Sequence, residues 1–186
     1  MVKFFIRIAL LVIVLHTALT PVSSSLSDKP RDQIVVAKKE DPAELARKEF
    51  ASQIKSYLEG KKSPLAEKTD YLLTKKHWKL LIAISAIESQ WCTRKLYLNC
   101  WGIGGDYAYR RYATLEEGID DADALISRWQ AKGKWLTVES MNGSYVVPRN
   151  PTWVRTVNSV IKDLNAIARR TMGSGALDDS GAHSER

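Results

Sequence analysis

The stretch from Leu80 to Gly104 reads LLIAISAIESQWCTRKLYLNCWGIG, and it decides the fold. Its first half is apolar on nearly every side when wound as a helix, which predicts a central buried helix over 76–89. One carboxylate, Glu88, falls in the last turn of that helix, and the turn-rich segment Asn99–Gly105 follows. A carboxylic acid at the end of a buried helix, facing a loop of Asn, Trp and Gly, is the arrangement expected of a general acid in a cleft.

Glu88 is flanked by apolar side chains, which are Ile84, Ile87 and Trp91. Such neighbours remove water from a carboxyl group and raise its pKa, because desolvation disfavours the charged form. A carboxyl that keeps its proton near neutral pH can donate that proton to a glycosidic oxygen. The alternative is a surface glutamate at a helix end, or one whose oxygens accept from backbone N–H groups.

Further helices are predicted before this stretch by their capping residues. Asp41 is a good N-cap, Pro42 fits the first helical position, and Gly60 ends the helix that they begin. Ser63 caps a short second helix that runs to about Leu73.

Three more helical segments are predicted after it. Thr114 and Glu117 have the spacing of a capping box, and the helix that they begin closes at Gly133. Residues 137–141 form a short turn, and Asn150 caps a last helix opened by Pro151. Between 90 and 113 helical periodicity stops, and the glycines there allow one small hairpin. We therefore expect an all-α, or α-dominated, fold.

The N-terminal residues indicate export. Residues 1–22 contain a basic start, a wholly apolar run and a polar exit, which are the parts of a signal peptide. An uncleaved N-terminal anchor, attached to a membrane, is the alternative. We expect a linker over 23–40, a catalytic domain over 41–170 and a flexible tail over 171–186, in a monomer located in the cell envelope, periplasmic or extracellular.

The net charge of +7 suits an anionic partner. The basic residues are scattered, and no helix alternates them with aromatics, so we expect no nucleic-acid partner. In an exported protein the two cysteines, Cys92 and Cys100, are expected to form a disulfide, whereas free thiols would indicate the cytosol. The three histidines lie at 16, 77 and 183, far apart in the chain, so neither a metal nor a cofactor is expected.

Several polar and aromatic side chains are candidates for a sugar-binding site. Trp129 and Trp153 fall on apolar helix faces and are expected in the core, while Tyr145 either packs on the core or places its hydroxyl beside Glu88. The loop aromatics that could stack on sugars are Tyr97, Trp101, Tyr107 and Tyr109. The candidates for a second carboxylate are Asp106, Glu116, Glu117, Asp120 and Asp121, and of these only Asp106 lies in the loop.

These motifs together resemble a known group. They are Ser63-Pro64-Leu65, Ala83-Ile84-x-x-Ile87-Glu88-Ser89, Asn99-Cys100-Trp101-Gly102, Tyr145, and Pro151-Thr152-Trp153. The chain is similar over about 63–164 to the lysozyme-like superfamily, and within it to bacterial glucosaminidase domains (mannosyl-glycoprotein endo-β-N-acetylglucosaminidase-like) and to soluble lytic transglycosylases.

The resemblance implies a helical lysozyme-like fold with a groove for the β-1,4-linked aminosugar strand of peptidoglycan. It implies that Glu88 is the catalytic acid and that Tyr145 assists it. The residues expected to bind substrate are Ser89, Asn99, Trp101, Gly102, Asp106 and Tyr107. Two alternatives stay open: hydrolysis (glucosaminidase or muramidase) versus lytic transglycosylation, and an enzyme versus a catalytically inactive peptidoglycan-binding module of an envelope assembly.

Overall fold

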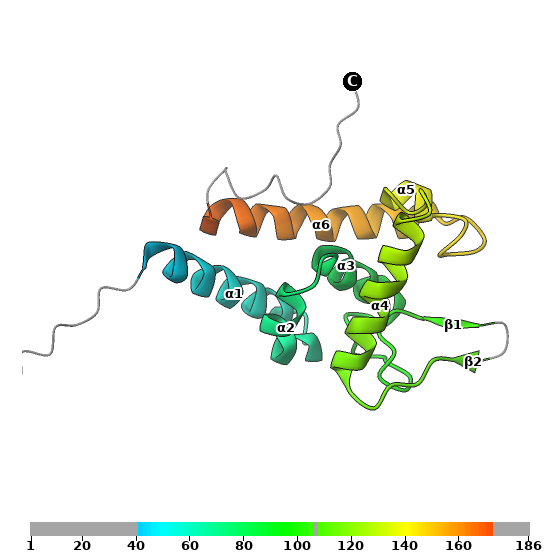
Figure 1. Cartoon of the computed structure of the whole chain (residues 1–186), viewed down its shortest axis with the longest axis horizontal. Helices are drawn as coiled ribbons and strands as arrows, with labels where there is room; N and C mark the ends of the chain where they lie inside the picture. Colours follow the sequence, from blue (N-terminus) through cyan, green and yellow to red (C-terminus); the bar gives the residue numbers. More distant parts are fainter. Residues whose placement is uncertain (1–40, 106–107, 173–186) are drawn as a thin grey trace, which may run out of the picture. The chain divides into compact units, whose positions relative to one another are not determined.

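Helix α3 (Trp78–Glu88) lies among the other helices in Figure 1, in contact with α6 (Pro151–Met172) and α4 (Leu115–Gln130). The computed structural model describes residues 41–105 and 108–172; the predicted leader and linker, Asp106, Tyr107 and most of the predicted tail lie outside them. Every residue of α3 from Leu81 to Ser85 is buried, which confirms the central buried helix. Helix α6 also contacts α1 (Pro42–Gly60). It ends two residues beyond the predicted domain boundary at 170.

Helix α1 begins and ends where its capping residues predict. The Asp41 carboxylate accepts from the Ala43 backbone N–H at 3.0 Å, and Pro42 is the first helical residue. Phe50, Ile54 and Leu58 form its buried face. Because these three side chains follow helical spacing, α1 presents one apolar side to the core and exposes the other.

The predicted second helix is two short elements instead of one. A 3₁₀-helix, η1, covers Pro64–Lys68, and α2 covers Thr69–Leu73. The Thr69 hydroxyl donates to the Ala66 carbonyl at 2.8 Å, across the junction. A side chain that bonds the backbone in this way competes with the regular ladder, which explains the break.

Helix α4 (Leu115–Gln130) starts as predicted, but its cap differs in detail. The Thr114 hydroxyl accepts from the Glu117 N–H at 3.2 Å, whereas the Glu117 carboxylate accepts from the Ala113 N–H and not from that of Thr114. The helix ends at Gln130, before Gly133. The short turn is α5 (Val138–Met141), which has a full capping box between Thr137 and Ser140.

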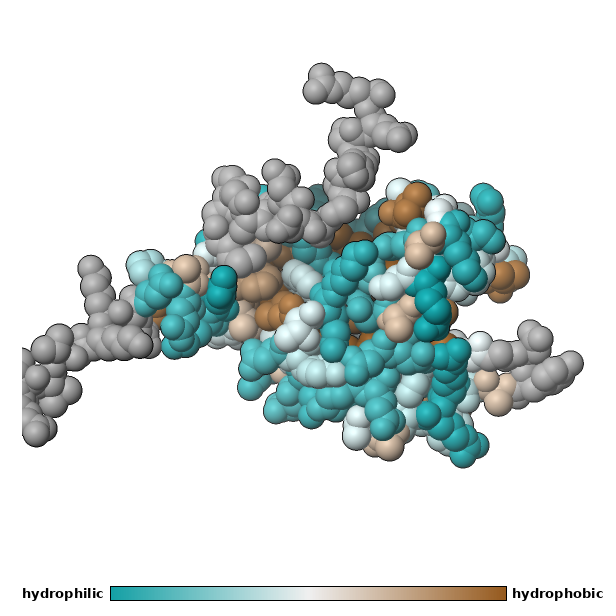
Figure 2. Space-filling view, viewed as in Figure 1, coloured by the Kyte–Doolittle hydropathy of each residue, from teal (hydrophilic) through white to brown (hydrophobic). Residues whose placement is uncertain are grey.

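The only strands among the described residues form one small hairpin, β1 (Gly104–Gly105) paired antiparallel with β2 (Ala108–Tyr109). The helical fold class is therefore confirmed, and the lysozyme-like groove stays a prediction. None of the helices in 41–105 and 108–172 has the length and apolar character to cross a bilayer. The face drawn in Figure 2 is largely hydrophilic, with hydrophobic residues gathered in smaller patches.

Candidate active site

Glu88 is the last residue of α3, and the chain turns sharply after it. The N–H groups of Ser89 and Trp91 both donate to the Ser85 carbonyl, at 3.2 and 2.9 Å, which closes the helix. The three residues from Gln90 to Cys92 then have φ values of 50, 63 and 65°, in the left-handed region. The reversal leaves Glu88 exposed at the helix end while α3 itself stays buried.

Two parts of the chain bracket the Glu88 carboxyl group. Trp153, near the start of α6, donates its indole N–H to Oε1 at 2.8 Å. Gly102 lies on the other side: a Cβ atom added there would be 3.0 Å from Oε2. The carboxyl group therefore sits between α6 and the loop that follows α3.

This packing changes the acidity of Glu88. Desolvation raises its pKa above the ordinary value for glutamate, and the hydrogen bond from Trp153 lowers it by less. Glu88 as a whole residue is exposed to solvent. Its carboxyl oxygens, however, are the atoms that contact Trp153 and Gly102, so the carboxyl group is partly desolvated although the residue is exposed. A carboxyl group that holds its proton to higher pH than usual, on an exposed residue, is suited to general acid catalysis.

Tyr145 lies beside this site but its hydroxyl is already bonded. The hydroxyl donates to the Trp101 carbonyl, and the ring centroid is 5.7 Å from that of Trp153. Burial raises the pKa of Tyr145 well above its ordinary value, and the charge of Glu88 raises it further. The hydroxyl therefore stays protonated and fixes the carbonyl that precedes Gly102.

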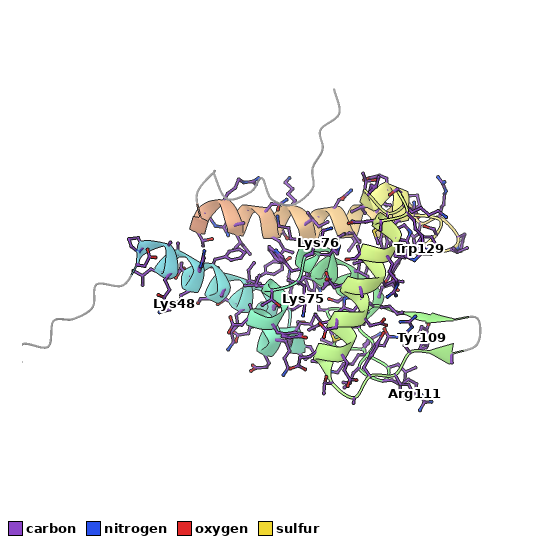
Figure 3. The ribbon with its side chains drawn as sticks, in the orientation of Figure 1. Lys48, Lys75, Lys76, Tyr109, Arg111 and Trp129 are labelled. Atoms are coloured by element: carbon purple, nitrogen blue, oxygen red, sulfur yellow. A yellow bond between two sulfur atoms is a disulfide. The ribbon has the colours of Figure 1, made fainter. Side chains whose placement is uncertain are left out.

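A row of aromatic rings leads away from Trp153. Tyr145 packs edge-on against Trp135 with centroids 5.2 Å apart, and Trp135 stacks on Trp129 at 4.9 Å. Trp129, labelled on α4 in Figure 3, is half-buried, whereas Trp153 is only 1% exposed. The expectation that Trp153 belongs to the core is confirmed, but its bond to Glu88 was not predicted.

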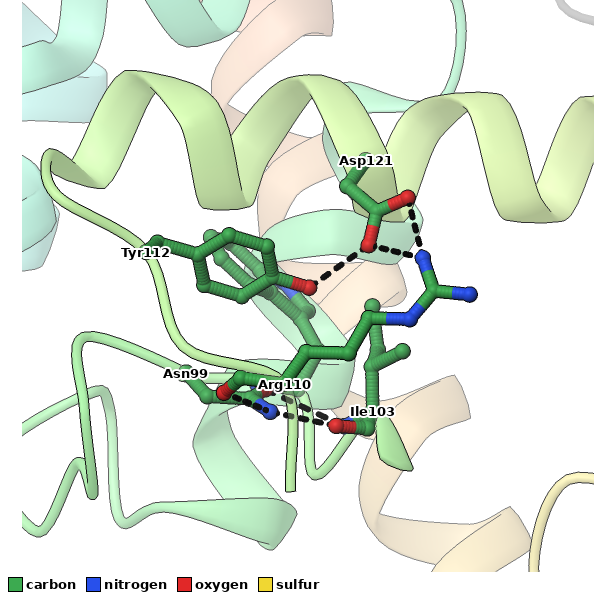
Figure 4. Close-up of polar contacts among 6 residues, drawn as sticks. Asn99, Ile103, Arg110, Tyr112 and Asp121 are labelled. Carbon is green, nitrogen blue, oxygen red and sulfur yellow. Dashed lines mark hydrogen bonds and ion pairs between the residues drawn. The ribbon is translucent and has the colours of Figure 1, made fainter. Parts of the chain in front are cut away.

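Asn99 has a different position from the substrate-binding one predicted for it. Its buried amide donates to the carbonyls of Ile103 and Arg110, and its Oδ1 accepts from the N–H groups of Trp101 and Ile103 (Figure 4). With its donors and its acceptor all bonded to backbone, Asn99 shapes the loop and does not present free groups to a ligand.

Ser89 and Trp101 are likewise buried instead of lining the surface. The Ser89 hydroxyl bonds the Cys100 carbonyl at 2.7 Å and accepts from the Cys92 N–H at 3.0 Å. Trp101 is 1% exposed, and its indole donates to the Leu81 carbonyl at 2.9 Å. Of the predicted substrate-binding residues that the structure describes, only Gly102 lies exposed against Glu88; Asp106 and Tyr107 lie outside the described residues.

The structure joins Cys92 to Cys100, with their Cα atoms 4.7 Å apart. Both side chains are buried, and the bond closes the segment between Glu88 and Gly102. The predicted disulfide is therefore compatible with the fold, and it joins the two ends of the segment 92–100.

The candidates for a second carboxylate on α4 all have other partners. Glu117 accepts from the Ala113 N–H, as described above. The ion pairs and hydrogen bonds of the others are Glu116 with Lys68, Asp120 with Lys75 and Tyr71, and Asp121 with Arg110 and Tyr112 (Figure 4). Within 41–105 and 108–172, no group of three or more His, Cys, Asp or Glu side chains could hold a metal ion. Among the second-carboxylate candidates that the structure describes, none lies free beside Glu88.

Two of the loop aromatics keep exposed rings. Tyr97 is 43% exposed and carries the Arg111 guanidinium 3.8 Å from its centroid, and Tyr109, on β2, is 56% exposed. Tyr109 and Arg111 are labelled in Figure 3. These rings stay candidates for contacts with sugars.

Gly102→Ala is expected to weaken both the fold and the site. Gly102 has φ +64°, a conformation that costs a residue with a Cβ about 1–2 kcal/mol, and the new methyl would press on Glu88 Oε2 at 3.0 Å. We expect a lower free energy of unfolding in urea. We also expect a loss of any activity that depends on Glu88, larger than the loss of stability explains. Gly133→Ala is the matched control, since Gly133 also has a left-handed φ of +70° but nothing lies within 4 Å of its added Cβ. Equal activity of the two variants would contradict a direct effect on Glu88.

Comparison with known proteins does not supply a function for this site. No family model matches the chain, and neither a curated protein nor a solved structure resembles it significantly.

Proposed function

We propose that this protein is a glycosidase that cleaves the β-1,4 linkages between N-acetylated aminosugars in peptidoglycan, with Glu88 as general acid and base. The observation that carries the proposal is Glu88 itself, an exposed residue at the end of α3 whose carboxyl group contacts Trp153 and Gly102. Desolvation of this carboxyl group raises its pKa, and this outweighs the lowering by the Trp153 hydrogen bond. The sequence resemblance supplies the substrate class, and the predicted leader and the net charge agree with an exported protein that meets an anionic wall.

In the proposed reaction Glu88 first gives its proton to the glycosidic oxygen as the C–O bond breaks. The sugar left behind has oxocarbenium character. Water, or the 6-hydroxyl of the same sugar, then forms the new bond at that carbon and returns its proton to the Glu88 carboxylate. Water gives hydrolysis, whereas the 6-hydroxyl gives an anhydro sugar, as in lytic transglycosylases.

The surrounding residues support this cycle by fixing the carboxyl group. Trp153 bonds Oε1, and its hydrogen bond is strongest when Glu88 is ionised, midway through the cycle. Tyr145 is a positioning residue in this scheme, because its hydroxyl holds the Trp101 carbonyl next to Gly102. Since the α4 carboxylates are engaged elsewhere, both proton transfers are assigned to Glu88 in this proposal.

The same engagement of the α4 carboxylates also favours a second candidate, a binding module that holds the glycan without cleaving it. Inverting and retaining hydrolases normally use two carboxylates, and the candidates on α4, the only ones that the described residues include, are bonded elsewhere. The test is release of dye-labelled fragments from purified peptidoglycan. Release by the wild-type protein supports the enzyme, whereas binding to the wall without release supports the module.

The pH dependence of fragment release gives a sharper prediction. Because Glu88 must be protonated to act first as an acid, we expect the rate to fall as pH rises through its pKa. Desolvation places that descending limb above the ordinary glutamate value of about 4.3. A limb at the ordinary value would contradict a desolvated catalytic acid.

The Trp153→Phe variant tests the same assignment, because it is expected to raise the pKa of Glu88 further. The hydrogen bond from Trp153 lowers the pKa of Glu88, so its removal is expected to move the descending limb to higher pH. The control is Trp129→Phe, because Trp129 belongs to the same aromatic row but its contacts are with Trp135 and not with Glu88. That variant should keep the wild-type limb.

A further inference from the structure

A pocket of about 330 Å³ lies beside the candidate active site, and nothing described so far uses it. It is formed by Tyr57 and Lys61 at the end of α1, by Trp91, and by residues of α6 between Thr152 and Asp163. Trp91 comes three residues after Glu88, and Thr152, which also lines the pocket, precedes Trp153. The volume is within the range of small-molecule sites, about 300–1,000 Å³.

Two aromatic rings and a cation are held together at this pocket. The rings of Tyr57 and Trp91 meet edge-to-face with centroids 5.7 Å apart. The Lys61 ammonium lies 5.4 Å from the Tyr57 centroid and 5.3 Å from that of Trp91. Aromatic rings offer flat apolar faces on which the C–H face of a pyranose can pack, and the lysine places positive charge next to them.

The position of Trp91 depends on an unusual backbone. Trp91 has φ +63° and lies between Gln90 and Cys92, which are also left-handed. Such a conformation costs a residue other than glycine about 1–2 kcal/mol, so three in succession persist only where the surroundings hold them. Here the disulfide at Cys92 and the bond from the Trp91 N–H to the Ser85 carbonyl hold the turn. The turn leaves Trp91 half-buried in the pocket wall instead of in the core.

The polar groups of the pocket favour a negatively charged ligand. Lys61 and Arg155 supply two cations, and Thr156 and Ser159 supply hydroxyls. The one carboxylate that lines the pocket is Asp163, which accepts from the Tyr57 hydroxyl at 3.2 Å. Its role is thus to orient the Tyr57 ring, and the two cations leave the pocket with net positive charge. A guanidinium and an ammonium are both good partners for a carboxylate.

We propose that this pocket binds a sugar ring that carries a carboxylate, with the ring against Trp91 and Tyr57 and the carboxylate between Lys61 and Arg155. Its use as a subsite for the strand that Glu88 cleaves rests on the proposed function. Binding of a single sugar needs no cleavage, however, so it can be measured whether or not the protein is an enzyme.

The test is NMR titration of the full, oxidised chain with three sugars. N-acetylmuramic acid and glucuronic acid carry carboxylates, and N-acetylglucosamine is the neutral counterpart of the first. The indole N–H signal of Trp91 is assigned as the one lost in Trp91→Phe. We expect the Trp91 signal to shift with at least one acid, at an affinity about threefold or more above that for N-acetylglucosamine. The acid that binds more tightly, N-acetylmuramic or glucuronic, shows which kind of sugar carboxylate the pocket recognises.

Lys61→Met and Arg155→Met are expected to remove this preference for the acids. Lys162→Met is the control, since Lys162 is exposed on α6 outside the pocket, and it should keep the preference. Equal affinity for all three sugars, or an unshifted Trp91 signal with both acids, would overturn the proposal. A protein that releases no peptidoglycan fragments but still binds an acid more tightly would contradict the proposed cleavage and support the proposed pocket.

Discussion

Glu88→Gln is expected to lower the rate of fragment release from peptidoglycan by about 10²–10⁴-fold, the usual contribution of general acid–base catalysis. The amide has nearly the same shape as the carboxylic acid, and its carbonyl oxygen can still accept the Trp153 indole N–H that bonds Oε1. It does not donate a proton to a leaving group. Steady-state release by purified variants measures the loss.

The substitution should not weaken the fold. Because the pKa of Glu88 is raised in the folded protein, stability is lost as pH rises from the ordinary glutamate pKa through the raised value. The neutral amide lacks that loss, so urea unfolding at neutral pH should show no lower stability than wild type. Glu139→Gln is the matched control: Glu139 is exposed on α5 and bonded to Asn158. A Glu88→Gln protein that releases fragments as fast as this control would contradict the assignment.

Reduction of the bond between Cys92 and Cys100 is expected to lower the free energy of unfolding by about 2.5 kcal/mol. The cysteines are eight residues apart, and the bond restricts the unfolded chain by closing that short loop. Reduction should also slow fragment release, since the closed segment joins Glu88 to the turn that carries Gly102. Urea unfolding of the oxidised and reduced protein gives the difference without any substitution.

The double variant Cys92→Ala/Cys100→Ala is the control for the reductant, and it should respond to it in neither stability nor activity. Thiol titration of the native wild-type chain checks the pairing itself. Two reactive thiols in the protein as isolated, or equal stability before and after reduction, would show that the bond does not hold this loop.

The local parts of the fold were predictable from short-range chemistry. Asp41, Ser63, Thr114 and Thr137 cap elements close to where the sequence places them, because a cap depends on residues only two or three positions away. The buried character of α3 was predictable for a similar reason, since a helix that is apolar on most sides has to be enclosed.

The candidate site was predictable only in part, because its bonds join distant residues. Glu88 and Trp153 are 65 positions apart, and on sequence alone Trp153 is one more apolar residue of a helix face. Asn99 and Trp101 sit in a loop and look available to a ligand. In the structure the Asn99 side chain is hydrogen-bonded to the backbone of that loop. The Trp101 indole N–H donates to a carbonyl of α3. A buried loop must satisfy its own polar groups, and which side chains do so depends on tertiary packing.

Mass spectrometry of the soluble products from purified peptidoglycan tests the central claim most directly. The wild-type protein is expected to release disaccharide-containing fragments, with anhydro-muramic ends if the 6-hydroxyl attacks and with a new reducing end if water does. Glu88→Gln, at the same concentration, should release none above background. Peptidoglycan left intact by the wild-type protein across the acidic and neutral pH range, or the same fragments released by both proteins, would contradict a catalytic Glu88.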